Sequence, residues 1–166
     1  MSSSRLNHLP FLISNFFPLL AVTTYGEWTS KGTRSYDMAV IKYWPDSNNR
    51  LIGDRIGYAG WQSVKHGSDS KLDSDYIRGY PYNKPDGTLW RSGTCNHWCY
   101  RRFLGICTQK HMSKLSCEAY KAMSGSAVMS SSGYVHGILV AETSSYKIAV
   151  LLYGRNVDKF RQWAGR

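Results

Sequence analysis

Apolar residues in this chain gather in short stretches, and clusters of turn-forming residues separate them. Short runs rich in Val, Ile and aromatic residues, bounded by Gly, Pro, Asn, Asp and Ser, are typical of β-strands. The segment 83–87, with the sequence NKPDG, is a strong turn signal. This spacing favours an antiparallel barrel or sandwich. The expected strands are Met38–Trp44, Arg55–Trp61, Tyr76–Tyr82, Ala127–Met129, Val135–Ala141 and Lys147–Tyr153.

The last part of the chain changes to a helical period. Between Asn156 and Trp163, the apolar residues Val157, Phe160 and Trp163 recur every third position. This period predicts a short amphipathic helix that packs one apolar stripe against the rest of the protein. No internal repeat and no linker divides the chain, so the pattern predicts one all-β domain followed by a C-terminal helix.

The segment 1–22 has a different character from the rest. Its apolar stretch Leu9–Val22 is interrupted by two prolines and an asparagine. No run approaches the roughly 20 apolar residues of a membrane-spanning helix, so we do not expect the chain to span a membrane. A basic residue, Arg5, precedes the apolar stretch, which is the arrangement of a secretory signal. A buried strand and a non-native N-terminal extension are the alternatives.

The composition shows that the chain can form a folded core, but it does not identify a binding partner. Of its 166 residues, 42% are hydrophobic and 14% aromatic, which excludes disorder throughout. Lys and Arg number 21 against 11 Asp and Glu, giving a net charge of +10. The basic residues are scattered, so we interpret them as a solvated surface and expect no nucleic-acid binding. Their densest group is Arg101, Arg102, Lys110, His111 and Lys114.

Four cysteines, Cys95, Cys99, Cys107 and Cys117, lie close together. An even, clustered set in a small basic chain indicates disulfides and an oxidising compartment, with three possible pairings. A zinc site is the alternative, but the usual CxxC spacing is missing. We therefore expect no metal.

The most informative motif is the sequence AMSGSA at 122–127, which precedes a predicted strand. A serine in a tight turn of small residues exposes its hydroxyl while neighbouring N–H groups point toward one spot, as nucleophilic catalysis requires. Serine and glycine are also common in plain surface turns, which is the alternative for Ser124.

Several motifs in a fixed order strengthen the catalytic interpretation. Asp37 precedes an apolar strand, a GYP turn follows at 79–81, then the SGSA turn, a VxGI strand at 135–138 and the Trp-bearing terminal helix. Together they resemble the second half of a chymotrypsin-like serine peptidase over 27–163, particularly the glutamyl-endopeptidase-like and related trypsin-like branches. The resemblance implies an all-β fold, a chymotrypsin-like antiparallel β-barrel with the second barrel complete and the first partial. The peptidase domain would be 23–166, without the early part of its first barrel.

The resemblance implies roles for three residues. Ser124 matches the nucleophile, and Asp37 matches the buried carboxylate that orients the catalytic imidazole. The N–H groups of Ala122 and Ser124 match the oxyanion hole, although the family usually has glycine where Ala122 stands. A side chain there is costly if the backbone φ is positive.

The expected catalytic histidine is missing from its usual place. The family places it 40 or more residues before the acid, whereas 36 residues precede Asp37 and their one histidine, His8, lacks the family's motif. Without a base the serine hydroxyl stays protonated, and in a related triad loss of the histidine alone lowers turnover about 10⁶-fold. We therefore expect very little peptidase activity.

The resemblance also implies a specificity pocket. Glu118 matches a position at its base, where an acid would favour a basic substrate side chain; a surface glutamate is the alternative. Leu139 stands where glutamyl endopeptidases carry a histidine, so glutamate specificity is disfavoured. Val140, Ala141 and Glu142 would form the edge that pairs with substrate backbone.

The same resemblance implies the disulfides Cys95–Cys117 and Cys99–Cys107. The expected function is that of a secreted, monomeric serine endopeptidase without a cofactor, acting through an acyl-enzyme on Ser124 and inactive for want of the histidine. The alternative is a non-catalytic homologue that binds polypeptides. We expect a polypeptide partner and no association with membranes.

Overall fold

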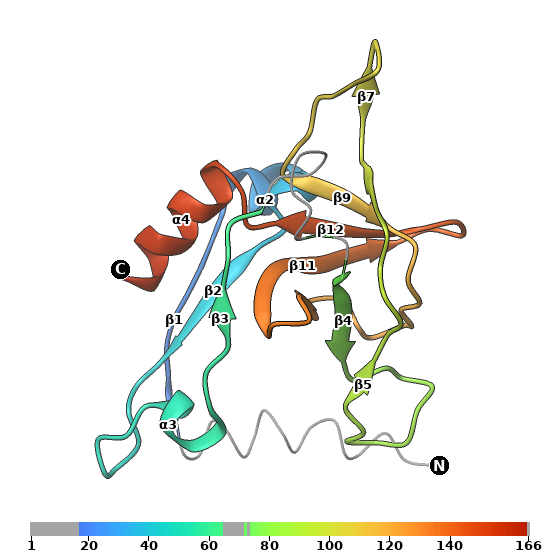
Figure 1. Cartoon of the computed structure of the whole chain (residues 1–166). Coiled ribbons are helices and arrows are strands. Elements are labelled where there is room, and N and C mark those ends of the chain that lie inside the picture. The colour runs from blue at the N-terminus through green and yellow to red at the C-terminus, as the bar shows by residue number, and fades with distance from the viewer. Residues whose placement is uncertain (1–16, 65–71, 73, 166) are drawn as a thin grey trace.

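The computed structural model describes residues 17–64, 72 and 74–165, and most of its strands belong to two sheets of unequal size (Figure 1). The smaller is a two-stranded ribbon of β1 (Leu19–Thr24) and β2 (Ala39–Tyr43). The helix α2 (Gly26–Lys31) and the 3₁₀ turn η1 (Arg34–Tyr36) connect its strands. Residues 19–22, which we had assigned to the leader-like segment, are therefore part of a paired strand, because β2 supplies their backbone hydrogen bonds.

The larger arrangement is an eight-stranded sheet with the order β5-β4-β10-β11-β12-β9-β6, in which β3 pairs with β11. Its neighbours are antiparallel except for the parallel pair β3 and β11. A backbone bridge between Asp75 and Cys95 ties the start of β4 to the segment before β6, so the sheet curls on itself. The strands are β3 (Gly60–Trp61), β4 (Tyr76–Gly79), β5 (Trp90–Arg91), β6 (His97–Cys99), β9 (Met112–Leu115), β10 (Ala127–Met129), β11 (Tyr134–Glu142) and β12 (Lys147–Leu151).

The segment from Arg55 to Trp61 is not the single strand that we predicted. It begins within α3 (Ile52–Ile56) and reaches β3 only at its last two residues. Asp54 explains the helix, because its carboxylate accepts the Leu51 N–H at 2.7 Å and caps the first turn. Gly57, with φ of 84°, then ends the helix.

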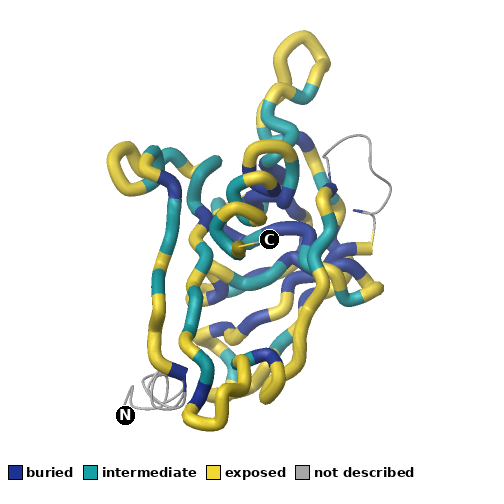
Figure 2. The backbone as a smooth tube through the Cα atoms, turned by 90° about the vertical axis from the view of Figure 1, so that its left-hand side faces the viewer, coloured by how far each residue is buried: buried dark blue, intermediate teal, exposed yellow. Residues whose placement is uncertain are grey.

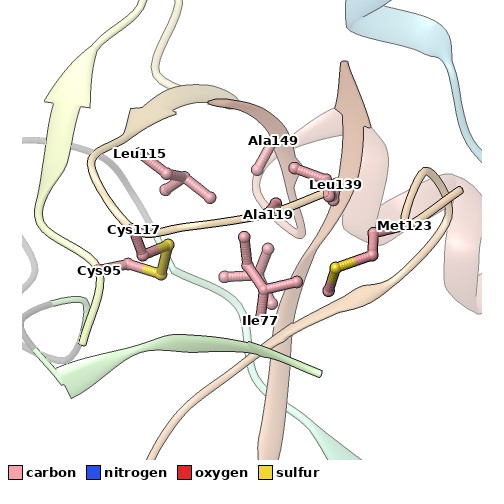
Figure 3. Packing of buried hydrophobic residues seen from close by; sticks show 9 residues of the cluster. Ile77, Cys95, Leu115, Cys117, Ala119, Met123, Leu139 and Ala149 are labelled. Atoms are coloured by element: carbon pink, nitrogen blue, oxygen red, sulfur yellow. A yellow bond between two sulfur atoms is a disulfide. The ribbon is translucent and has the colours of Figure 1, made fainter. Parts of the chain in front are cut away.

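The core of the curled sheet lies between its strands and the loop that precedes Ser124 (Figure 3). Its buried members come from β4, β9, β10, β11, β12 and the loops before β6 and after β9, and the disulfide Cys95–Cys117 lies at one side of it. They are Ile77, Cys95, Leu115, Cys117, Ala119, Met123, Val128, Leu139 and Ala149. This packing fixes one end of the loop that carries the candidate nucleophile.

The terminal helix α4 (Arg155–Ala164) lies against the ribbon and the curled sheet, as expected from its apolar stripe (Figure 1). Its residues Val157, Phe160 and Trp163 pack with Tyr25 of the ribbon and Trp61 of β3. A hairpin of β7 (Arg102–Phe103) and β8 (Ile106–Cys107) projects from the other elements, and its residues are largely exposed (Figure 2). In the part of the chain that the structure describes, no helix is long and apolar enough to cross a membrane.

Candidate functional site

The loop 120–126 presents Ser124 at the surface by burying its neighbour. Met123 is fully buried, whereas Ser124 is exposed. The Met123 N–H donates to the Tyr120 carbonyl at 3.2 Å, and the Ser126 N–H donates to the Met123 carbonyl at 2.9 Å. These bonds form a tight turn whose buried methionine anchors it to the core.

The same loop is fastened to β11. The Gly125 N–H donates to the Leu139 carbonyl at 2.7 Å, and the Leu139 N–H donates to the Ser126 carbonyl at 2.9 Å. Gly79 of β4 packs so closely against Ser126 that a Cβ at position 79 would overlap the serine side chain. The loop is therefore held on both sides by strands of the curled sheet.

Only some amides of the loop have an acceptor within the described residues, and that of Lys121 has none. Those of Met123, Gly125 and Ser126 donate to backbone carbonyls. Within the described residues, the N–H groups of Ala122 and Ser124 have no acceptor. Ala122 has φ of 70°, the left-handed conformation that glycine would adopt without strain. Two unpaired amides beside an exposed hydroxyl are the donors that an oxyanion needs.

Two cavities meet at Ser124. One of about 270 Å³ is lined by Tyr120, Lys121, Ala122, Ser124, Leu139, Ala141 and Glu142. The other, of about 340 Å³, lies on the side of β4 and is lined by Arg78, Gly79, Tyr80, Leu89, Ala122, Ser124, Gly125, Ser126 and Ala127. Ala122 and Ser124 line both cavities, so an extended ligand that crosses Ser124 would have space on either side.

Two charged residues line the first cavity: Glu142, whose carboxylate is paired, and the exposed Lys121, which makes no ion pair with a described carboxylate. The carboxylate of Glu142 accepts from the Lys147 ammonium at 3.1 Å. Glu118 is exposed and does not line this cavity; its carboxylate accepts the Tyr120 hydroxyl at 3.1 Å. That hydrogen bond raises the pKa of the Tyr120 hydroxyl. The structure therefore places the carboxylate of Glu118 against the Tyr120 hydroxyl and outside the lining of this cavity, and its role in specificity stays a prediction.

No described imidazole reaches the nucleophile. The Ser124 hydroxyl donates to the Val140 carbonyl at 3.4 Å. Among the described histidines, His97 and His136 lie against Asp75, and His111 lines a separate cavity with Tyr36 and Arg155. The candidate His8 lies outside the described residues.

Asp37 follows η1 in the small ribbon and lies between Tyr36 and the buried Met38. It is half-buried, and burial raises the pKa of its carboxyl group while the charge of Arg34 partly opposes the change. In the described part of the chain, Asp37 lines neither cavity at Ser124 and makes no side-chain hydrogen bond. The structure therefore does not join Asp37 to Ser124 by a direct contact.

The disulfides are Cys95–Cys117 and Cys99–Cys107, the pairing that the resemblance implied. The first stabilises the approach to the Ser124 loop, and the second closes the base of the β7–β8 hairpin. Both indicate that the chain folds in an oxidising environment.

The fold of most of the chain is similar to that of a solved peptidase. A solved Glu endopeptidase, in complex with MPD, superposes on 90% of this chain with a TM-score of 0.67 and 18% sequence identity. The fold is that of a chymotrypsin-like peptidase. The superposition covers 65% of the length of that enzyme. No protein-family model and no curated protein matches the sequence.

A buried polar cluster was missed by sequence reasoning. Asp75, fully buried, lies 2.9 Å from His136 Nδ1 and 3.3 Å from His97 Nε2. Gln62 lies 3.3 Å from the other nitrogen of His136. These residues come from segments far apart in the sequence, and no motif or period links them, so no signal in the chain could have revealed the cluster.

Proposed function

We propose that this protein is a serine-endopeptidase-like protein that binds polypeptides across Ser124 and hydrolyses them very slowly. The observation that carries the proposal is the pair of unpaired amides, Ala122 and Ser124, between two cavities. A carbonyl group of a bound peptide would accept from these amides. The edge of β11 at Val140–Glu142 would pair with the peptide backbone, as in other cases of strand addition.

The first cavity suits an apolar side chain. Leu139, Ala141 and Tyr120 line it, and its one carboxylate, from Glu142, is bound to Lys147. The other charged group of its lining is the ammonium of Lys121, which would repel a basic side chain. A buried guanidinium or ammonium would find no free counter-charge there, which disfavours a basic residue. We therefore propose that the peptide places an apolar residue in this cavity.

The chemistry that the site could perform is acyl transfer. The Ser124 oxygen would attack the peptide carbonyl carbon, an imidazole would take the serine proton and return it to the leaving amine, and water would then release the acyl group. In the described structure the hydroxyl donates to the Val140 carbonyl instead. Binding without efficient cleavage is the consequence.

Full peptidase activity is the second candidate, and the two unpaired amides also favour it. It requires a histidine that reaches Ser124 from outside the described residues. Two disulfides are in keeping with a secreted protein in either case, and we propose secretion.

Labelling with a fluorophosphonate probe separates the two candidates. We expect slow labelling of Ser124, none in Ser124→Ala, and acceleration of the wild-type reaction by free imidazole, because the added base supplies a group that no described residue places beside Ser124. Rapid labelling that imidazole does not change, and that His8→Ala abolishes, would establish the peptidase and overturn the proposal of slow hydrolysis.

Peptide binding is tested separately by fluorescence anisotropy with labelled peptides that carry Leu, Arg or Glu at one position. We expect the Leu peptide to bind tightest, and Ala141→Phe to weaken it at least about tenfold by filling the cavity. Ala59→Phe, at an exposed position outside the cavity, is the control. Equal binding of all peptides to both variants would contradict the proposed site.

A further inference from the structure

The β7–β8 hairpin presents apolar side chains to solvent at the point farthest from the core. Phe103, Leu104 and Ile106 are 69%, 86% and 66% exposed. The hairpin extends away from the rest of the chain at the top of both views (Figures 1 and 2). Contiguous exposed apolar side chains mark interaction sites, since they gain free energy only when something covers them.

The hairpin is built to hold this tip in one shape. Phe103 pairs with Ile106 across the two strands, and the disulfide Cys99–Cys107 closes the base. The Thr108 N–H donates to the Arg101 carbonyl at 3.0 Å. Because the strand pairing, the disulfide and this hydrogen bond already restrict the tip, it loses little conformational entropy when it binds.

The turn places a leucine where local folding disfavours it. Leu104 and Gly105 have φ of 47° and 81°, so both central residues of the turn are left-handed. Asn, Asp or Gly normally occupy such positions. The conformation of the turn therefore does not explain why a leucine stands at position 104. An exposed leucine at a position that disfavours it is consistent with a role in binding.

The charges around the tip identify the partner. Arg101 and Arg102 are exposed and make no ion pair with a described carboxylate. The segment 99–110, which includes the hairpin, contains three Lys or Arg residues and no Asp or Glu. A projecting apolar tip with a basic collar fits a bilayer that carries negative headgroups, because the tip reaches the acyl boundary while guanidinium groups stay at the phosphates.

We propose that the β7–β8 hairpin inserts its tip, Phe103, Leu104 and Ile106, into the surface of an anionic membrane. This inference is independent of the proposed function and differs from our expectation of no membrane association. That expectation followed from the absence of a spanning segment, whereas a hairpin tip needs only to enter the interface.

Co-sedimentation with vesicles tests the proposal. We expect the wild type to bind vesicles of phosphatidylcholine mixed with phosphatidylglycerol, and to bind pure phosphatidylcholine vesicles at least about tenfold more weakly. The triple variant Phe103→Ser, Leu104→Ser, Ile106→Ser keeps every charge and should lose binding about tenfold or more. Ile56→Ser, at a 74% exposed position in α3, is the matched control and should bind like the wild type.

A second variant, Arg101→Gln with Arg102→Gln, should weaken binding to anionic vesicles by roughly tenfold while it leaves the apolar tip intact. Equal binding by the triple serine variant would mean that charge alone attracts the protein, and would overturn the proposal. Absence of vesicle binding would overturn it too. A dimer of the wild type that the triple variant cannot form, seen by light scattering without vesicle binding, would assign the tip to a second copy instead.

Discussion

At the scale of single residues, Ala122 is the clearest departure from local preference. It adopts φ of 70° in the loop that presents Ser124, and its amide has no acceptor among the described residues. A side chain in the left-handed region is strained by roughly 1–2 kcal/mol. The hydrogen bond from the Met123 N–H to the Tyr120 carbonyl, which spans Ala122, and that from the Gly125 N–H to the Leu139 carbonyl hold the backbone in this conformation. The surrounding structure therefore stabilises a strained residue at the site.

Replacing Ala122 with glycine should stabilise the protein. Relief of the strain outweighs the higher entropy of glycine in the unfolded chain, and we expect the free energy of unfolding to rise by roughly 0.5–1 kcal/mol. Urea denaturation measures the change. Ala127→Gly is the control, because Ala127 lies in β10 without a positive φ and should lose about 0.5–1 kcal/mol. A loss in Ala122→Gly as well would show that residue 122 is unstrained.

At the scale of elements, the buried cluster of Asp75, His97 and His136 joins the strands β6 and β11 to the start of β4. Asp75 precedes β4, His97 begins β6 and His136 lies in β11. Burial by itself would raise the pKa of the Asp75 carboxyl group, but the interactions with His136 and His97 outweigh it and lower that pKa. Since a carboxylate only accepts, His136 Nδ1 donates to it.

This cluster predicts how stability depends on acid pH. Because the pKa of Asp75 is lower in the folded state, its contribution is fully present above the unfolded pKa of about 4 and is lost as the pH falls through the folded value. Asp75→Asn should therefore lose about 3 kcal/mol at pH 7 and show a flatter decline of the unfolding free energy in acid. Urea denaturation at several pH values from neutral to acid measures both effects. Asp86→Asn, at an exposed aspartate, should follow the wild type, and a parallel decline in both variants would contradict the role of Asp75.

The elements show which structures the sequence could predict. Strands with several Val, Ile or Leu residues, such as Val135–Ala141, were found within a residue or so, because apolar runs identify them. The strands between residues 90 and 115 were missed because each has two to four residues and few apolar positions. The loop of Ser124 could be located from its motif, whereas the position of Glu118 depends on its contact with Tyr120, which no motif encodes.

At the scale of the whole molecule, α4 joins the small ribbon to the curled sheet. Tyr25 is buried beside Trp163, with ring centroids 4.8 Å apart, and its hydroxyl donates to Asn156 Oδ1 at 3.0 Å. Burial raises the pKa of Tyr25 to about 12, even though the charge of Arg155 opposes the change. Because the ribbon carries Asp37 and the curled sheet carries Ser124, their relative position depends on this contact. Sequence could predict the apolar stripe of α4 but not its partner, which belongs to a distant segment.

Tyr25→Ala should loosen the ribbon while the curled sheet stays folded. Removing a buried aromatic side chain costs about 3–5 kcal/mol, whereas Tyr25→Phe loses only the hydrogen bond and about 1 kcal/mol. Hydrogen exchange followed by mass spectrometry measures this segment by segment. In Tyr25→Ala we expect amides of β1, β2 and α2 to exchange roughly a hundredfold faster, while those of β10, β11 and β12 keep their protection.

Tyr82→Ala is the control, because the Tyr82 side chain is 75% exposed. This control variant should leave amide exchange unchanged in the ribbon, in α2 and in β10, β11 and β12, because no buried ring is lost. Equal acceleration in the ribbon and the curled sheet of Tyr25→Ala would mean that the two unfold as one cooperative unit. Selective acceleration would show instead that α4 couples two parts of unequal stability.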